Sequence, residues 1–246
     1  INIPEATARG IPVGHTPGIL TDATADFAFA LLMSAARRVV EADAHTRAGL
    51  WKTWGPSTLL GSDFVGSTLG IVGFGRIGRA MAKRASGFDM RIIYYDPTAE
   101  IDPAINAQPV SSLEELLRQS DFVSLHAPLT PQTRHMINAS TLALMKPNAV
   151  LVNTARGQMI DQAALYDALR GGKLFAAALD VTDPEPLPMD SPLLSLPNLI
   201  VAPHIASGSQ RTRAEMSVLT ADNLIAGLKG ERLPRCVNPQ VYEQSA

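Results

Sequence analysis

The strongest restriction on how this chain folds is a glycine pattern that follows an apolar run and precedes a helical pattern. Leu69 to Val72 predicts a buried strand, and Arg79 to Ser86 predicts a helix. Between them, Gly73, Gly75 and Gly78 give the spacing G-x-G-x-x-G. In this context the first glycine permits a tight turn, the second lets backbone approach a pyrophosphate, and the third lets helix and strand pack closely. The stretch therefore predicts a dinucleotide site, and a purely structural turn is the alternative.

An acidic residue stands where such a site needs one. Arg91 to Tyr95 predicts the next strand, and Asp96 follows it, 23 positions after Gly73 (96 − 73 = 23). An acid about 20 residues after the first glycine binds the adenosine ribose hydroxyls. Its charge repels a 2′-phosphate, and Pro97 to Glu100 offer no lysine or arginine to hold one. We therefore expect NAD(H) to be preferred over NADP(H).

Composition excludes other classes of function. The chain has 246 residues, a net charge of -2 and 18% charged residues, so it lacks the basic excess of a nucleic-acid or membrane-surface binder. Its single cysteine, Cys236, excludes an internal disulfide and indicates a reducing compartment, the cytoplasm. The apolar helical run from Ala23 to Ala36 contains Asp26 and is too short to span a bilayer. We predict no metal site.

Strands and helices alternate from Thr68 onward, which predicts a parallel sheet with helices on both faces. Ser112 is predicted to cap a helix that ends at Arg118, and Asp161 a helix that ends at Arg170. The further predicted elements are strands at Asp121–Leu125, Ala149–Asn153, Leu174–Leu179 and Leu199–Val201, and a last helix at Gln210–Leu228.

The segment from Asp22 to Arg47 has a helical pattern and predicts one long helix, capped by Asp22. At ~1.5 Å per residue this helix would be about 40 Å long. Its first half is apolar on nearly every face, so we expect it to lie between domains or between subunits. The connector at 49–67 carries Trp51 and Trp54, which belong either to the core or to an arm that packs on a partner.

Polar side chains follow the later strands at the edge where the glycine loop is expected. Arg156 follows one strand, Asp180 and then Glu185 follow the next, and His204 follows the last. Each could be structural when taken alone. Together they supply a bidentate grip for a carboxylate, a proton donor near neutral pH, and a carboxylate that favours an imidazolium. These groups are needed to pass a hydride between nicotinamide and a 2-oxo acid.

The chain resembles the D-isomer-specific 2-hydroxyacid dehydrogenases from residue 1 to about Pro239. The spacing from Glu185 to His204 is 19 (204 − 185 = 19), which fits the pattern of the family. The matching runs are Gly70–Gly78, Asn153–Gly157, Leu179–Val181, Glu185–Pro186 and Pro203–Ile205. Within the family, the glyoxylate and hydroxypyruvate reductases look most similar, on Trp51–Trp54, Thr182–Pro188 and Leu228–Glu231.

The resemblance implies a role for each candidate. Arg156 would hold the substrate carboxylate, His204 would be the general acid in reduction, and Glu185 would support its protonation. Trp51 or Trp54 would reach the active site of a neighbouring subunit, which implies a homodimer. The implied cofactor contacts are Thr24, Gly73, Phe74, Gly75, Arg76, Ile77, Gly78, Asp96, His126, Ala127, Pro128, Thr133, Thr154, Ala155, Arg156, Asp180 and His204.

The resemblance also implies an α/β fold in three parts. Residues 21–205 would form a Rossmann-type, doubly wound parallel sheet that binds NAD. Residues 1–20 would be a remnant of a second, flavodoxin-like substrate domain, and residues 206–246 a helix that returns to it. Members of the family carry more of that domain ahead of the position of Ile1, so we expect residues 1–246 alone to turn over substrate slowly.

Two other functions stay open on the sequence. Some relatives use NAD binding as a switch that recruits partners, and they keep Arg156, Glu185 and His204. Formate dehydrogenases of the same superfamily pair the histidine with an amide, so Glu185 argues against that activity.

Overall fold

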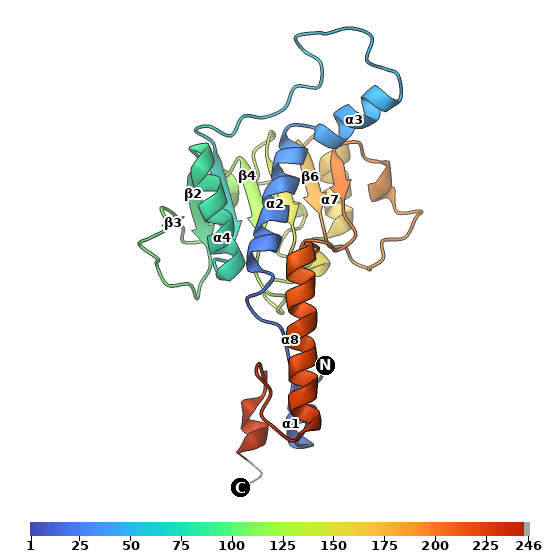
Figure 1. The fold of residues 1–246 in the computed structure, drawn as a ribbon. Helices are drawn as coiled ribbons and strands as arrows, with labels where there is room; N and C mark the ends of the chain where they lie inside the picture. The colour runs from blue at the N-terminus through green and yellow to red at the C-terminus, as the bar shows by residue number, and fades with distance from the viewer. Residues whose placement is uncertain (244–246) are drawn as a thin grey trace. The chain divides into compact units, whose positions relative to one another are not determined.

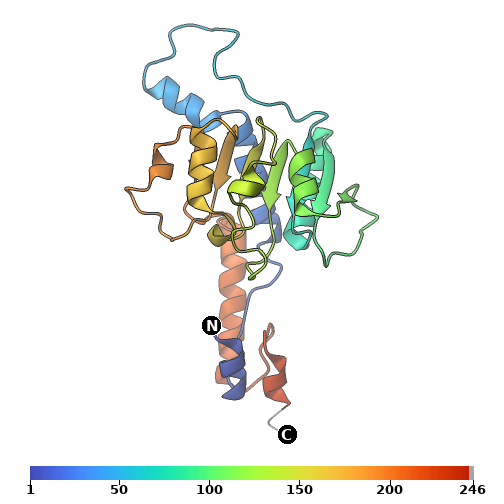
Figure 2. The ribbon, with the colours of Figure 1, turned by 180° about the vertical axis from the view of Figure 1, so that it is seen from behind.

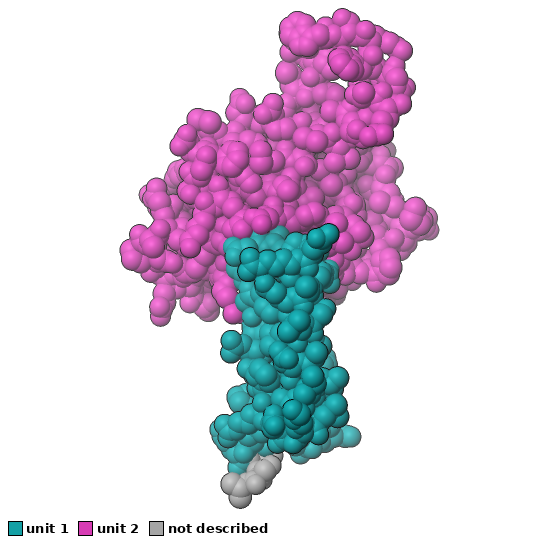
Figure 3. Space-filling view, viewed as in Figure 1, with its two compact units in different colours: residues 1–23, 207–246 teal, residues 24–206 magenta. Residues whose placement is uncertain are grey.

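A computed structural model describes residues 1–243, and the chain divides into two compact units. One unit joins Ile1–Ala23 to the segment that begins at Ser207, and the other is Thr24–Ala206. Figure 3 distinguishes the two units by colour.

The larger unit contains one sheet of seven strands, in the order β3-β2-β1-β4-β5-β6-β7, and every neighbouring pair is parallel. The order reverses between β1 and β4, so the switch point where such sheets bind ligands lies at the end of β1. The prediction of a Rossmann-type sheet is confirmed. The strands are β1 (Thr68–Val72), β2 (Arg91–Tyr95), β3 (Gln108–Pro109), β4 (Phe122–Leu125), β5 (Val150–Asn153), β6 (Ala176–Leu179) and β7 (Leu199–Val201).

Helices cover both faces of the sheet (Figures 1 and 2). Residues of α2 (Thr21–Ala36) and α4 (Arg76–Ala85) pack into one hydrophobic core, and those of α5 (Leu113–Gln119), α6 (Ala139–Leu142) and α7 (Gln162–Arg170) into another. Every residue of β1, β4, β5 and β6 is buried, as expected for strands covered on two sides. Short 3-10 turns occupy η1 (Ser86–Phe88), η2 (Gly157–Met159) and η3 (Pro192–Ser195).

Both predicted helix caps in the sheet region are confirmed. The Ser112 hydroxyl accepts a hydrogen bond from Glu115 N, and the Asp161 carboxylate accepts from Ala163 N and Ala164 N. These side chains satisfy backbone donors that the first turn of a helix leaves unpaired. They fix where α5 and α7 begin.

The prediction of one long helix up to Arg47 is wrong. The chain forms two helices, because α2 ends at Ala36 and α3 runs over Val39–Arg47. Arg38 between them has φ 54°, a left-handed conformation that an α-helix does not accommodate. Its guanidinium is held by Glu41 through two hydrogen bonds of 2.8 and 2.6 Å. The predicted cap is also misplaced, since α2 begins at Thr21 and Asp22 lies in its first turn.

The connector at 49–67 separates its aromatic side chains. Phe64 is 7% exposed and stacks on Phe122, with ring centroids 4.8 Å apart. Trp51 and Trp54 are 64% and 80% exposed, so neither is part of the core. The interpretation of the tryptophan pair as core is therefore wrong, and an arm that packs on a partner stays a prediction.

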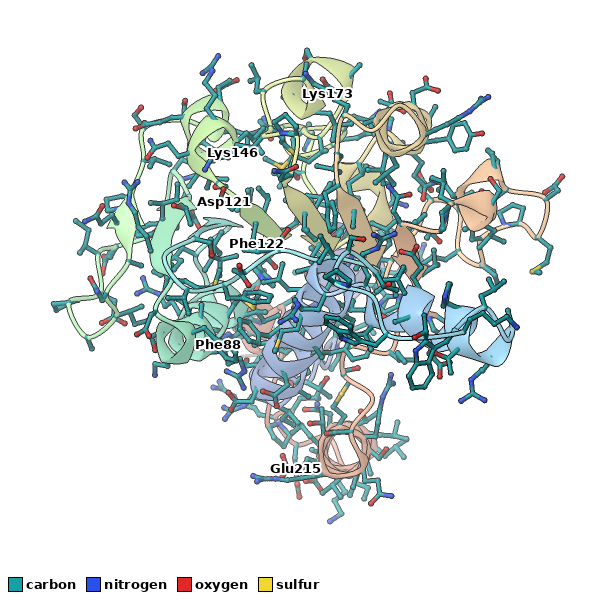
Figure 4. All side chains as sticks on the ribbon, turned by 90° about the horizontal axis from the view of Figure 1, so that it is seen from above. Phe88, Asp121, Phe122, Lys146, Lys173 and Glu215 are labelled. Atoms are coloured by element: carbon teal, nitrogen blue, oxygen red, sulfur yellow. The ribbon has the colours of Figure 1, made fainter. Side chains whose placement is uncertain are left out.

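The edge of the sheet where the strands begin is held by structural polar contacts, and Figure 4 labels several of its residues. Asp121 immediately precedes β4, and its carboxylate accepts from Thr68 N at 2.9 Å. The other carboxylate oxygen pairs with Lys146 Nζ at 2.7 Å. Asp121 therefore joins the starts of neighbouring strands, and β4 begins one residue later than predicted.

The smaller unit consists of α1 (Ile3–Ala8), the long helix α8 (Gln210–Leu228) and the turn η4 (Pro239–Tyr242). The bounds predicted for the last helix are confirmed. Asn238 is fully buried and joins the two ends of the chain, accepting from Val13 N at 2.8 Å and donating to Ile11 O at 3.0 Å. Across residues 1–243, we find no helix with the length and apolar character needed to traverse a membrane.

Candidate active site

The glycine loop connects β1 to α4 at the switch point of the sheet. Gly73 has φ +88°, and a Cβ there would lie 2.5 Å from Ala127 N. A Cβ on Gly78 would overlap the Gly73 carbonyl oxygen. Among residues 1–243, nothing lies within 4 Å of the Cβ position of Gly75. The first and third glycines are thus required by packing, whereas the second leaves open space beside the backbone.

The first turn of α4 faces that open space without a competing group. Gly75 is the N-cap residue, no side chain caps the helix, and its first turn contains no acidic residue. Free N–H groups at a helix N-terminus favour an anion such as a pyrophosphate. Arg76 is exposed at this turn, and Ile77 is half-buried. Phe74 contributes its backbone alone, because its ring is buried and stacks on Tyr94 with centroids 3.8 Å apart.

Asp96 follows β2 and binds the glycine loop directly. One carboxylate oxygen accepts from Phe74 N at 2.8 Å, and the other accepts from Thr98 N and its hydroxyl at 2.9 Å. Burial would raise the pKa of the Asp96 carboxyl, but the hydrogen bonds from Thr98 and Phe74 outweigh it and hold the pKa below its usual value. The carboxylate is therefore charged at neutral pH.

His126 and the residues after it border the glycine loop, because Gly73 packs against the backbone of Ala127. His126 Nε2 lies 2.8 Å from Ser124 Oγ, and burial lowers the pKa of its imidazole to about 4. Its ring is neutral at physiological pH. Thr133 donates from its hydroxyl to Pro128 O at 2.7 Å, which folds the following turn back onto this segment.

Arg156 is carried by a turn that a buried amide holds. Asn153, the last residue of β5, accepts from Ala155 N and donates to Arg156 O, both at 2.9 Å. The Arg156 side chain is exposed, and its Nη1 donates to Ala155 O at 2.6 Å. Sequence reasoning assigned no role to Asn153. Its signal was an amide that ends an otherwise apolar strand.

Two threonines expected to contact the cofactor are buried. Thr154 is 8% exposed, and its hydroxyl has no hydrogen-bond partner among residues 1–243. An unpaired buried hydroxyl is costly, so a bound ligand is a natural partner for it. Thr24 on α2 is 4% exposed, and no hydrogen bond joins it to the other candidates within the part of the chain that the structure describes.

Asp180 follows β6 and holds the loop that carries His204. The Asp180 carboxylate is 1% exposed and accepts from Ile205 N at 2.7 Å and from Ala206 N at 2.8 Å. Its carbonyl oxygen accepts from His204 N at 2.8 Å. Both carboxylate oxygens therefore have protein partners. The contact of Asp180 with the cofactor, which the resemblance implies, stays a prediction.

Glu185 and His204 lie in contact, as expected from their spacing. The distance from Glu185 Oε2 to His204 Nδ1 is 2.9 Å, and Glu185 Oε1 accepts from Thr182 N at 3.0 Å. Burial would raise the pKa of the Glu185 carboxyl, but the hydrogen bonds from His204 and Thr182 and the charges of His204 and Arg156 bring the pKa below its usual value. Half of the His204 side chain is exposed, at 53%, so the ring stays accessible.

A pocket of about 500 Å³ opens beside this pair. Its polar lining includes Glu185 and His204, and its apolar lining includes Leu187, Met189 and Leu194. Within residues 1–243, no group of three or more His, Cys, Asp or Glu side chains is arranged to hold a metal ion. The candidate site contains a guanidinium, a histidine and a carboxylate. These groups suit proton transfer and the binding of an organic acid.

The residues present fit a nicotinamide dinucleotide. Gly75 leaves room for a pyrophosphate at the start of α4, the Asp96 carboxylate stands at the end of β2, and the Thr154 hydroxyl lacks a partner among the described residues. These groups follow β1, β2 and β5, whose ends meet at one edge of the sheet.

Known proteins resemble this chain in sequence and in fold. The chain is 55% identical over 246 residues to a glyoxylate reductase of Korarchaeum cryptofilum (strain OPF8), covering 99% of this chain and 74% of that protein. A crystal structure of a protein from Thermus thermophilus matches with a TM-score of 0.91 and 52% identity, over 96% of this chain and 75% of that one. An NADPH-dependent glyoxylate/hydroxypyruvate reductase from Sinorhizobium meliloti matches with a TM-score of 0.86 and 34% identity, over 97% and 75%.

The family match covers the larger unit almost completely. Residues 29–206 match the NAD binding domain of D-isomer specific 2-hydroxyacid dehydrogenases. This span contains the glycine loop, Asp96, Arg156, Glu185 and His204. The chain therefore belongs to the D-isomer specific 2-hydroxyacid dehydrogenase family of oxidoreductases.

Proposed function

We propose that this protein reduces small 2-oxo acids, glyoxylate and hydroxypyruvate foremost, to 2-hydroxy acids with NADH. The observation that carries the proposal is the 2.9 Å contact between Glu185 and His204, at the sheet edge that also holds the glycine loop. The identity of 55% to a protein named glyoxylate reductase supports the substrate class.

Arg156 binds the substrate in this proposal. Its guanidinium is exposed, and its charge contributes to the lowered pKa of the Glu185 carboxyl. A guanidinium binds a carboxylate through two parallel hydrogen bonds, which orients as well as holds it. The neighbouring carbonyl of the 2-oxo acid then faces His204.

His204 supplies the proton. Its Nδ1 is held by Glu185, so Nε2 is the ring nitrogen left to donate to the carbonyl oxygen of the substrate. The hydride for the carbonyl carbon would come from a nicotinamide cofactor when one is bound. Glu185 fixes the orientation of the ring and stabilises the imidazolium until the proton leaves. Positioned acid catalysis of this kind contributes on the order of 10² to 10⁴ in rate.

The cofactor of the proposal is NADH. The backbone at 73–78 and the open space at Gly75 would hold the pyrophosphate, and Asp96 would accept hydrogen bonds from the ribose. A charged Asp96 disfavours a 2′-phosphate, although the Sinorhizobium meliloti relative is named as NADPH-dependent. His126 to Pro128 and Thr133 would border the adenosine. Thr24, Thr154, Ala155 and Asp180 would border the nicotinamide. Tighter binding of NADPH than of NADH in calorimetry would refute this assignment.

The proposal includes a homodimer. Trp51 and Trp54 are 64% and 80% exposed on a connector whose Phe64 is anchored in the core. Exposed tryptophans are favoured at the centres of interfaces, and a second copy is the partner expected for them. Sedimentation of the protein and of a Trp51→Ser, Trp54→Ser double variant measures this directly.

A chain with one cysteine also suits the reducing cytoplasm.

The deciding experiment follows NADH oxidation with glyoxylate, hydroxypyruvate, pyruvate and bulkier 2-oxo acids. We expect turnover with the small acids and its loss in His204→Asn, while NADH still binds. Arg156→Gln is expected to raise the KM for the 2-oxo acid strongly. Binding of NADH without turnover of any 2-oxo acid would instead favour a regulatory protein that recruits partners.

The pH profile tests the role of Glu185. Replacing its carboxylate in Glu185→Gln removes the charge that favours the imidazolium, so the alkaline limb of the reduction profile moves to lower pH. Cofactor affinity is expected to stay the same. An unmoved limb would show that Glu185 does not support the proton donor.

A further inference from the structure

We propose that Gln162 is a positioning residue for this reaction, because it fixes the backbone at Asp183 and thereby aims the Glu185 carboxylate at His204. The inference rests on the proposed function for its catalytic consequence. The structural argument concerns one segment, Thr182 to Glu185. This segment lies in the loop after β6 and carries the Glu185 side chain.

Gln162 makes a paired contact with a single residue of that segment. Its Oε1 accepts from Asp183 N at 3.1 Å, and its Nε2 donates to Asp183 O. An amide that satisfies both the N–H and the C=O of one residue holds that residue in position and orientation. A flipped amide would place donor against donor and acceptor against acceptor, so the geometry defines one arrangement.

The location of Gln162 makes this contact rigid. It is the first residue of α7, and the preceding residue, Asp161, caps the helix by accepting from Ala163 N and Ala164 N. The Gln162 side chain is half-buried, and both polar atoms of its amide are bound to Asp183. The fixed start of a helix thus supports a segment that has no helix or strand of its own.

Thr182 links the backbone of this segment to the Glu185 carboxylate. Thr182 is 5% exposed, and its hydroxyl donates to Pro184 O at 2.8 Å. Its backbone N–H donates to Glu185 Oε1 at 3.0 Å, which leaves Glu185 Oε2 for His204. Because the two carboxylate oxygens have these separate partners, a shift of the segment weakens one contact or both.

A second glutamine links the same segment to Arg156. Gln158 follows Arg156 by two positions, and its Nε2 donates to Asp183 Oδ1 at 3.1 Å. A Cβ on Gly157 would overlap the Thr182 carbonyl oxygen, so the two loops are in close contact. Gln158 makes one bond to a side chain, whereas Gln162 makes two to backbone. Gln162 is therefore expected to contribute more to the position of Glu185.

The charged groups around the pair belong to two loops, those after β5 and β6. Arg156 acts on Glu185 through its positive charge, and Asp180 binds the backbone of the loop that carries His204. Asp183 binds Gln158. Replacing Gln162 changes none of these charges, so a change in the pH profile would report altered geometry.

Gln162→Met tests the inference, because methionine has a similar length and lacks both hydrogen bonds. We expect kcat to fall roughly 10- to 100-fold, the effect of a small misplacement of a catalytic group. The alkaline limb of the reduction profile is expected to move to lower pH, and the affinity for NADH to stay unchanged. Gln119→Met is the matched control, since Gln119 is also half-buried on a helix and donates to Glu115 at 3.0 Å, outside the site.

A second measurement needs no turnover. The ring of His204, assigned by NMR with a His204→Asn variant, is titrated in the wild type and in Gln162→Met. We expect the midpoint to move to lower pH in the variant. Should Gln162→Met fail to fold, Gln162→Asn, a shorter amide that withdraws from Asp183 without adding a charge, is expected to move the midpoint in the same direction.

Unchanged profiles in both measurements, with reduced thermal stability alone, would overturn the inference and make Gln162 a structural residue. A shifted His204 titration in a protein that reduces no 2-oxo acid would support the positioning and refute the proposed reaction. The two ideas therefore fail by different results.

Discussion

Asp180→Asn perturbs the contact that holds the loop of His204. The Asp180 carboxylate is 1% exposed and accepts two backbone hydrogen bonds, from Ile205 N at 2.7 Å and from Ala206 N at 2.8 Å. Asparagine has the same shape but only one acceptor oxygen. Its NH₂ group would face one of the two N–H donors, so a buried donor loses its partner.

The cost follows from these contacts. A hydrogen bond to a charged group contributes about 1.5–3 kcal/mol, and a buried donor left unsatisfied costs about 1–3 kcal/mol. These terms overlap, so we expect the free energy of unfolding to fall by about 2–4 kcal/mol. For a unit of this size, a loss near 3 kcal/mol lowers Tm by roughly 6–12 °C.

Urea denaturation followed by circular dichroism measures the change. Asp190→Asn is the control, because Asp190 is exposed and its substitution is expected to stay within about 0.5 kcal/mol. If Asp180→Asn unfolds at the same urea concentration as Asp190→Asn, the carboxylate does not hold this loop. The result does not depend on enzymatic activity.

Two further predictions concern the glycine loop and its neighbour. The pKa of His126 is about 4 in the folded protein, whereas an unperturbed histidine, as in the unfolded chain, has a pKa of 6.5. As pH falls, the unfolded chain therefore takes up the proton before the folded protein does. The stability that the neutral ring contributes is complete above pH 6.5 and decreases toward pH 4, by on the order of 3 kcal/mol. The unfolding free energy of the wild type should therefore fall relative to that of His126→Gln over this range, and a constant difference would refute the assignment. In Gly78→Ala the new Cβ overlaps the Gly73 carbonyl oxygen, so we expect a loss of about 1–3 kcal/mol and much weaker NADH binding in calorimetry. Gly87→Ala is the control, because no described residue lies within 4 Å of the Cβ position there, and equal losses in the two variants would contradict the overlap.

Local signals explain where the sequence predicted the fold well. Arg91–Tyr95 and Gln162–Arg170 were predicted with the bounds that the structure has. The first is an apolar run bounded by polar residues, and the second has an aspartate cap and a glycine at its end. Both signals lie within the element itself, so no distant contact was needed to interpret them.

The break at Arg38 had no such signal. The pattern around it continues as a helix, and neither proline nor glycine interrupts it. The Ala36 carbonyl accepts from Ser62 N at 2.9 Å, a partner that lies far along the chain. Propensity alone therefore extended the helix, and tertiary contacts ended it. The two-residue strand β3 was missed because so short a run has no period to detect.

The candidate site also contains residues that the sequence predicted and residues that it did not. Arg156, Glu185 and His204 were found because parallel strands end at one edge, so residues after each strand converge. Gln162 was predicted only as the first residue of a helix. Its partner, Asp183, lies 21 positions away, and no local pattern distinguishes a helix-starting glutamine that binds a loop from one that faces solvent.

The supporting residues at this edge nevertheless share one device. Asp96 and Asn153 each follow or end a buried strand, and each accepts from the backbone N–H two positions later. Asp96 also binds the loop after the neighbouring strand, at Phe74, and Asp180 does the same toward the loop after β7. A side chain at the end of one strand thus fixes the loop of the next strand in the sheet. Because the loops after β1 and β7 are each held by the end of a neighbouring strand, the strand order itself positions the glycine loop and the loop that carries His204.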